Sequence, residues 1–138
     1  MTSRDEREAL ARFSERYAVP TADIAGEIEQ RVIGATWGAN GYTTVAQADE
    51  LGRRLHLGAD DTLLDVGTGR GWPGLYLATR TGCRVFGTDM PVDALGIAAR
   101  RARSEGIAGR VGLAAAAGAD QPFRDESFDA VVLTDVLC

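Results

Sequence analysis

The stretch LDVGTGRGWPG at residues 64–74 has the composition of a ligand-binding loop. Its alternating glycines, Gly67, Gly69 and Gly71, would let the backbone turn tightly and approach a ligand, with the free N–H groups of a following helix behind it. Asp89 stands 18 residues after Gly71, at the end of the next expected strand, where a carboxylate accepts hydrogen bonds from ribose hydroxyls. The combination predicts a nucleoside-containing ligand. The alternative is a glycine-rich turn with a capping aspartate.

Two classes of nucleoside ligand fit this loop. Residues Gly69 to Gly74 satisfy the G-x-G-x-x-G pattern of dinucleotide-binding proteins, which is a weak signal alone. Asp65, two residues before the first glycine, distinguishes the classes, because a carboxylate there suits a cationic ligand and would repel a pyrophosphate. The sequence therefore favours a cationic nucleoside. A nicotinamide-dependent oxidoreductase is the less favoured alternative.

Strands and helices must alternate around this loop to present it to a ligand. Short apolar runs predict strands at 62–66, 84–88, 110–113 and 128–134, and helical periodicity predicts helices over 72–80 and 92–104. Such alternation is typical of right-handed βαβ units and a parallel sheet. The predicted fold class is α/β, a Rossmann-like doubly wound parallel sheet that is incomplete, with about four strands and an N-terminal helical extension.

The N-terminal extension shows helical signals throughout. Ser3 and Glu6 have the spacing of a capping box. Ile24, Ile28 and Val32 recur every four residues, as on one apolar helix face. A further helix is expected from Thr44 to about His56. We therefore expect a helical segment over 1–57 and the N-terminal half of a nucleoside-binding domain over 58–138.

Composition excludes several functional classes. Hydrophobic residues make up 45% and charged residues 25% of the 138 residues, and no apolar run approaches the roughly 20 residues that span a bilayer. The net charge of −5 argues against a nucleic-acid partner, and the charged N-terminus lacks a secretion signal, so we expect a cytoplasmic protein. All 15 basic residues are arginines, which excludes a Schiff-base lysine. Two cysteines, Cys83 and Cys138, are too few for a four-ligand zinc site, and no metal is expected.

Taken together, these motifs resemble class I S-adenosylmethionine-dependent methyltransferases. The family's first motif, an acid followed by G-x-G-x-G, corresponds to Asp65–Gly71, and the acid of its second strand corresponds to Asp89. PFRDESFDAVV at 122–132 resembles the segment leading into strand four, and TDVL at 134–137 resembles the motif after it. The resemblance covers residues 40–138 and is closest to the small-molecule branch with ubiquinone/menaquinone-type and sterol-type enzymes.

The resemblance implies S-adenosylmethionine as co-substrate and transfer of its methyl group to a small-molecule acceptor. Asp65 would contact the methionine ammonium, directly or through water, and the three loop glycines would pass under the donor. Asp89 would hold the ribose hydroxyls, Met90 would pack on the adenine, and Thr134 would offer backbone contacts near the amino-acid end.

Four other positions have less defined roles. Tyr42 lies in the segment that the resemblance would close over the donor, and is equally explained as a helix-packing aromatic residue. Ala117 stands where many relatives carry an aspartate that meets the adenine amino group, so Asp120 is either its substitute or a plain loop acid. Asp135 is the nearest candidate for a general base, with a supporting or capping role as the alternative. The catalytic residues are otherwise unknown.

The chain stops at Cys138, just after the fourth expected strand, whereas the family's sheet continues. We therefore expect a truncated methyltransferase, or a half-domain completed by a second copy or another chain at the exposed edge of strand four. A non-catalytic donor-binding remnant or interaction module is the alternative.

Overall fold

The computed structural model describes residues 3–18, 23–39 and 41–136. The helices within these ranges are α1 (Arg4–Ala18), α2 (Asp23–Ile33), α3 (Val45–Arg54), α4 (Gly74–Thr81), α5 (Val92–Ser104) and the 3₁₀ turn η1 (Ala108–Arg110). The strands are β1 (Thr62–Val66), β2 (Arg84–Asp89), β3 (Val111–Ala115) and β4 (Ala130–Val132). Of the two cysteines, Cys83 is fully buried, and Cys138 lies outside the described residues.

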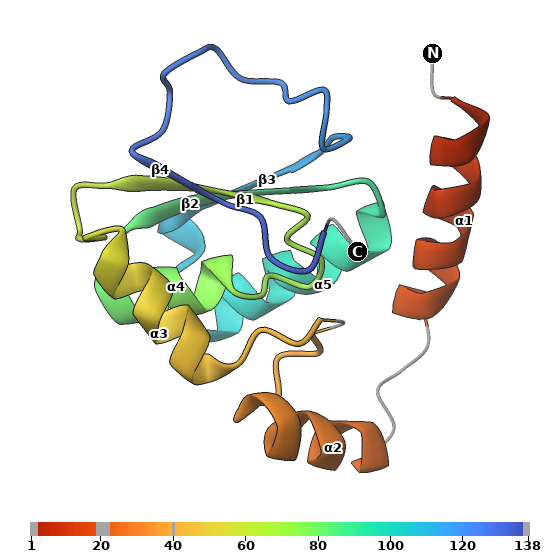
Figure 1. Ribbon diagram of the computed structural model, residues 1–138, viewed down its shortest axis with the longest axis horizontal. Helices are drawn as coiled ribbons and strands as arrows, with labels where there is room; N and C mark the ends of the chain where they lie inside the picture. The colour runs from red at the N-terminus through yellow and green to blue at the C-terminus, as the bar shows by residue number, and fades with distance from the viewer. Residues whose placement is uncertain (1–2, 19–22, 40, 137–138) are drawn as a thin grey trace.

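The four strands form one parallel sheet in the order β3-β2-β1-β4, which confirms the α/β, Rossmann-like prediction. Helices α4 and α5 lie along one face, and the long connection from β3 to β4 passes over the opposite face (Figure 1). The chain steps outward from β1 to β3 and then returns to the other side of β1. Ligands bind at such a switch point, at the carboxyl ends of the strands.

Several element boundaries differ from those expected; β2 is one residue longer and α3 is shorter than predicted. The strand expected over 128–134 is only three residues long, because β4 pairs with β1 from Ala130 to Val132 and the chain then turns away. Strand β3 extends to Ala115 because it pairs with β2 as far as Asp89. Helix α4 begins at Gly74, so the preceding proline lies in the turn.

The hydrophobic core crosses the boundary expected at residue 57. Ile33 and Ala48, from α2 and α3, belong to the same buried cluster as Leu63 of β1. Trp37, which follows α2, packs against Trp72 with ring centroids 5.9 Å apart. The N-terminal segment is therefore packed onto the sheet domain next to the glycine loop.

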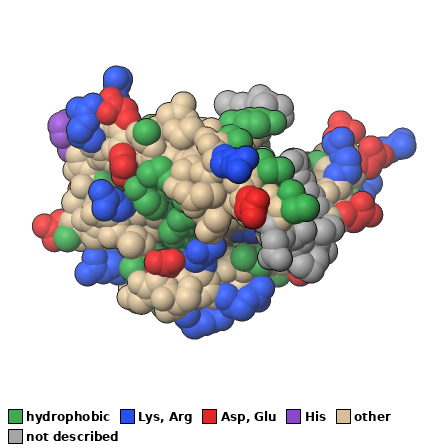
Figure 2. Space-filling view, turned by 90° about the horizontal axis from the view of Figure 1, so that it is seen from below, with side chains coloured by type: hydrophobic (Ala, Val, Ile, Leu, Met, Phe, Trp, Pro, Cys, Tyr) green, Lys and Arg blue, Asp and Glu red, His purple; other side chains and the backbone are tan. Residues whose placement is uncertain are grey.

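The apolar face predicted for α2 is exposed and does not pack against the core. Ile24, Ile28 and Val32 do share one face, but they are 70%, 57% and 52% exposed, whereas the neighbouring Ile33 provides the buried contact. Figure 2 views the molecule from the side of α2 and shows hydrophobic side chains at this surface among charged ones. No helix in the described ranges is both long and apolar enough to cross a membrane.

Candidate functional site at the carboxyl end of the sheet

The loop between β1 and α4 is fastened to the end of β2. The N–H groups of Gly67 and Thr68 both donate to the Thr88 carbonyl, at 2.7 and 3.0 Å. Gly67, Gly69 and Gly71 have φ values of 75°, 55° and 100°. These are left-handed conformations that L side chains rarely adopt, so the alternating glycines meet a backbone requirement of the loop.

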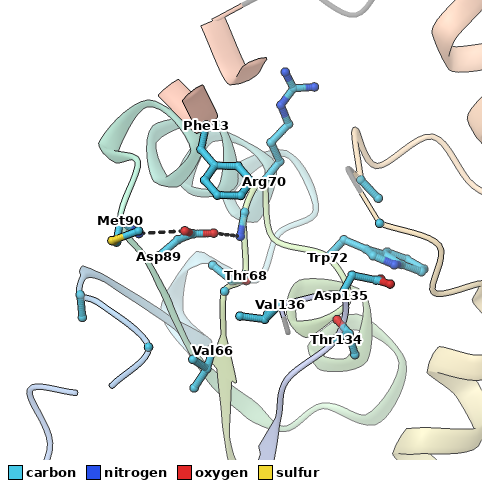
Figure 3. A pocket seen from close by; sticks show the side chains of 16 residues that line it. Phe13, Val66, Thr68, Arg70, Trp72, Asp89, Met90, Thr134, Asp135 and Val136 are labelled. Carbon is cyan, nitrogen blue, oxygen red and sulfur yellow. Dashed lines mark hydrogen bonds between the residues drawn. The ribbon is translucent and has the colours of Figure 1, made fainter. Parts of the chain in front are cut away.

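Asp89, the last residue of β2, faces this loop. Its Oδ2 accepts a 2.7 Å hydrogen bond from the Gly69 N–H, and its Oδ1 accepts a 2.8 Å bond from the Met90 N–H (Figure 3). Burial raises the pKa of this carboxyl, and the two backbone bonds oppose that rise. The carboxylate is thus held in one orientation by the backbone and keeps lone pairs for further donors.

A cavity of about 330 Å³ opens between the glycine loop, the ends of β2 and β4, and the N-terminal segment. Its lining residues are Phe13, Ala39, Gly41, Val66, Gly67, Thr68, Gly69, Arg70, Trp72, Asp89, Met90, Ala116, Gly118, Thr134, Asp135 and Val136. The structure therefore brings five of the residues selected from the sequence as donor-binding to one cavity, together with Asp135. Those five are Gly67, Gly69, Asp89, Met90 and Thr134.

Asp65 does not line this cavity. It is fully buried, and its Oδ2 accepts hydrogen bonds from Thr68 Oγ1 at 2.8 Å and from the Gly74 N–H at 2.9 Å, whereas Oδ1 has no hydrogen-bond partner among the described residues. Burial raises the pKa of Asp65 to about 7. In this conformation the carboxylate, expected to contact a ligand's ammonium directly or through water, supports the loop and the start of α4. Contact through water stays a prediction.

Three other expected site residues also lie outside the cavity wall. Tyr42 is 80% exposed, although its neighbour Gly41 lines the cavity. Gly71 is buried. Asp120 is exposed, and its N–H donates to the Ala117 carbonyl at 3.0 Å within a tight turn. Asp120 therefore does not line the cavity in this conformation, and its role toward the adenine stays a prediction.

Asp135 is engaged with the N-terminal segment. Its Oδ2 accepts hydrogen bonds from the Thr43 N–H at 3.1 Å and from Thr43 Oγ1 at 2.8 Å. Of the two roles left open by the sequence, this contact favours the supporting one, because one carboxylate oxygen already holds two donors.

The N-terminal segment contributes walls that the sequence did not indicate. Phe13 of α1 lies beside Asp89 at the mouth of the cavity (Figure 3). Ala39 is positioned by Glu29, whose carboxylate accepts bonds from the N–H groups of Trp37, Gly38 and Ala39 at 2.7, 3.0 and 2.9 Å. Only tertiary packing reveals these residues.

Two further lining residues had a local signal. Arg70 and Trp72 lie between and just after the loop glycines, so a search of the motif's own neighbours would have found them. No group of three or more His, Cys, Asp or Glu side chains in the described ranges is arranged to hold a metal ion.

The sequence profile of the methyltransferase domain family matches residues 63–138, which is more than half of the chain. The chain belongs to this family. Methyltransferase GfsG of Streptomyces halstedii is 39% identical to this chain over 83 residues. These residues make up 60% of this chain and 30% of GfsG. The chain thus spans less than a third of the length of that relative.

Two solved methyltransferases share the fold. One is geranyl diphosphate C-methyltransferase from Streptomyces coelicolor A3(2), solved with Mg²⁺, geranyl diphosphate and S-adenosyl-L-homocysteine. Its TM-score is 0.72 at 25% sequence identity, and the match covers 96% of this chain and 54% of that enzyme's chain. A SAM-dependent methyltransferase from Thiobacillus denitrificans, solved with S-adenosyl-L-homocysteine, has a TM-score of 0.58 at 30% identity over 65% of this chain and 36% of its own. Since the match with the Streptomyces coelicolor enzyme covers 96% of this chain, the N-terminal helices of this chain belong to the architecture that the two proteins share.

Proposed function

We propose that this chain forms the donor-binding part of an S-adenosylmethionine-dependent methyltransferase that acts on a small-molecule acceptor. The observation that carries the proposal is the placement of Asp89. Its carboxylate is fixed by the Gly69 and Met90 N–H groups at the wall of a cavity at the carboxyl ends of the strands. An acid held there is suited to accept hydrogen bonds from the two hydroxyls of a ribose.

The chemistry of the cavity wall fits the donor. The loop at Gly67 and Gly69 presents backbone without side chains to the cavity. Met90 supplies a polarizable apolar surface beside Asp89, which suits a purine ring. At the other end, Thr134 offers polar groups to an amino acid. The volume of about 330 Å³ is within the range of small-molecule sites.

S-Adenosylmethionine supplies an activated methyl group on a sulfonium sulfur, so the protein's task is to hold the reactants in line and to exclude water. In this chain Asp89 orients the nucleoside, and the glycine loop allows close approach of the backbone. Trp72, Val66 and Val136 provide apolar surface that displaces water from the cavity.

The relatives support an acceptor of modest size. Geranyl diphosphate is the acceptor named for the Streptomyces coelicolor structure that this chain resembles over 96% of its length. For this chain we propose an acceptor of the same general class, a small organic molecule. The net charge of −5 supports the exclusion of nucleic acid as a partner.

We also propose that the free edge of β4 pairs with a further strand. Within the part of the chain that the structure describes, β4 pairs with β1 and has no strand on its other side, and Val131 and Leu133 are 48% and 49% exposed. An apolar edge of this kind favours pairing with another strand. A completing segment, from a second copy or another chain, would cover it and add to the acceptor side of the cavity.

Calorimetric titration of the purified chain tests the donor site. We expect saturable binding of S-adenosylmethionine and S-adenosylhomocysteine and none of NADH. Asp89→Ala should abolish binding, whereas Asp93→Ala, which removes an exposed acid in the first turn of α5, should not. NADH binding in place of S-adenosylhomocysteine would contradict the proposal.

A further inference from the structure

Thr43 and Asp135 are 92 positions apart in the sequence and meet at the wall of the cavity. Asp135 Oδ2 accepts both the Thr43 N–H, at 3.1 Å, and the Thr43 hydroxyl, at 2.8 Å. Gly41 lies against the same carboxylate, and a Cβ at position 41 would overlap it. The absence of a side chain at Gly41 is therefore what lets the two segments approach.

A second hydrogen bond holds the same residue from the opposite side. Trp72 Nε1 donates to the Thr43 carbonyl at 3.0 Å. Trp72 is itself fixed, because it is 6% exposed and its ring packs against those of Trp37 and Tyr76 at 5.9 and 5.2 Å. The N–H and the carbonyl of Thr43 are thus both bonded to residues that line the cavity.

Asp135 holds its position through an unusual backbone conformation. Its φ of 57° is left-handed, which aspartate and asparagine tolerate better than most residues. The flanking residues Thr134 and Val136 also line the cavity. The turn after β4 therefore presents the Asp135 carboxylate to Thr43 and forms part of the cavity wall.

We propose that Asp135 is a positioning residue that clasps the segment Gly41–Thr43 across the end of the donor cavity and thereby slows the release of a bound donor or product. The inference rests on the proposed donor site. It assigns Asp135 a role other than proton transfer, and it identifies Thr43 as the residue through which Asp135 holds this segment.

Hydrogen exchange of the Thr43 amide in the ligand-free chain tests the clasp without any ligand. Asp135→Gly keeps the left-handed backbone and removes the carboxylate. We expect the Thr43 amide to exchange about three- to tenfold faster in this variant, the effect of losing one exposed charge-assisted hydrogen bond. Glu126→Gly is the matched control, because Glu126 is an exposed acid with a φ of 56° outside the cavity wall.

Stopped-flow dissociation of S-adenosylhomocysteine tests the consequence for ligand release. We expect Asp135→Gly and Thr43→Val each to release it about three- to tenfold faster than the wild type, with smaller changes in the association rate. Combining the two substitutions should add little, because both remove the same contact. Asp135→Asn, which keeps an oxygen acceptor and tolerates the backbone, should recover most of the wild-type rate.

The outcomes separate the clasp from the donor site. Failure of the wild type to bind S-adenosylhomocysteine, together with faster amide exchange in Asp135→Gly, would overturn both the donor site and the role in release, leaving only the contact. If the wild type binds and Asp135→Gly shows unchanged exchange and release, the clasp is wrong. Faster exchange with unchanged release would reduce Asp135 to a structural contact and overturn the proposal.

Discussion

The Gly74 N–H donates a 2.9 Å hydrogen bond to Asp65 Oδ2, so the carboxylate of a buried strand residue caps the neighbouring helix α4. Pro73 stands at the N-cap position and makes no side-chain capping bond. Asp65 supplies the missing acceptor from β1, and the Thr68 hydroxyl donates a hydrogen bond to the same oxygen, Oδ2. The acid before the glycines is therefore a structural support of the loop in this conformation.

This contact makes Gly74 intolerant of a side chain. A Cβ there would lie 2.5 Å from Asp65 Oδ2 and 3.0 Å from Val85 Cγ2. We expect Gly74→Ala to lower the free energy of unfolding by about 1–3 kcal/mol, as overpacking of a core does. Gly96→Ala is the matched helical control, because the nearest described side-chain atom to a Cβ there is Arg100 Nη1, at 3.8 Å. This variant should raise stability by up to about 1 kcal/mol. Urea unfolding followed by circular dichroism measures both, and equal effects would refute the steric account.

Asp65 should also make stability depend on pH. Its pKa rises from an ordinary 3.8 to about 7 in the folded chain because burial disfavours the charged form. Between these values the folded state binds more protons than the unfolded state, so the free energy of unfolding falls as pH rises from about 4 to about 7. The full loss is on the order of 4 kcal/mol.

Asp65→Asn isolates this contribution, because asparagine keeps an acceptor oxygen and does not titrate. We expect the variant to lack the decline, so that its stability relative to the wild type increases between pH 5 and pH 7. Urea midpoints at several pH values provide the measurement. Parallel profiles for the two proteins would show that Asp65 is not the titrating group.

The carboxylate of Glu29 should be required to shape the N-terminal wall. It accepts the N–H groups of three consecutive residues, 37–39, the last of which lines the cavity. Glu29→Gln replaces one acceptor oxygen by a donor, which should cost about 1–3 kcal/mol of stability and weaken S-adenosylhomocysteine binding. Glu27→Gln, an exposed change on the same helix, should stay within about 0.5 kcal/mol of the wild type. A Glu29 variant as stable as the Glu27 variant would rule this role out.

Phe13 should matter for binding and little for folding. It lines the cavity beside Asp89 but is 42% exposed. We expect Phe13→Ala to raise the Kd for S-adenosylhomocysteine about two- to tenfold, the range of an aromatic contact, with an almost unchanged urea midpoint. Val92→Ala, at a residue 68% exposed on α5, is the apolar control. Equal affinities of the wild type and Phe13→Ala would remove α1 from the donor site.

Local signals account for the parts of the fold that were predicted from sequence. The helix over Val92–Ser104 and the strand over Thr62–Val66 have the expected bounds, because each is set by its own periodicity and by flanking turn residues. The loop glycines were identified because a left-handed backbone restricts the residue type. Asp89 reached the cavity because it ends a strand of a parallel sheet, an outcome that follows from topology alone.

Tertiary packing decides the parts that were not predicted. The sequence does not show that Asp65 would turn to the start of α4, since this depends on how closely Gly74 approaches β1. Nor does it show that Phe13 reaches the mouth of the cavity, or that Thr43 meets Asp135 across 92 positions. Tyr42, chosen for its aromatic side chain, is exposed, and it is the backbone beside it that contributes to the site.

The most direct test of the donor site compares S-adenosylhomocysteine with its 2′-deoxy analogue on the wild type and on Asp89→Ala. If Asp89 accepts the ribose hydroxyls, the wild type should bind the parent compound at least about tenfold more tightly, since a hydrogen bond to a charged group is lost in the analogue. Any residual binding to Asp89→Ala should be weak and equal for the two ligands. A wild type that binds the two ligands alike, or an Asp89→Ala variant that still discriminates between them, would contradict the central assignment.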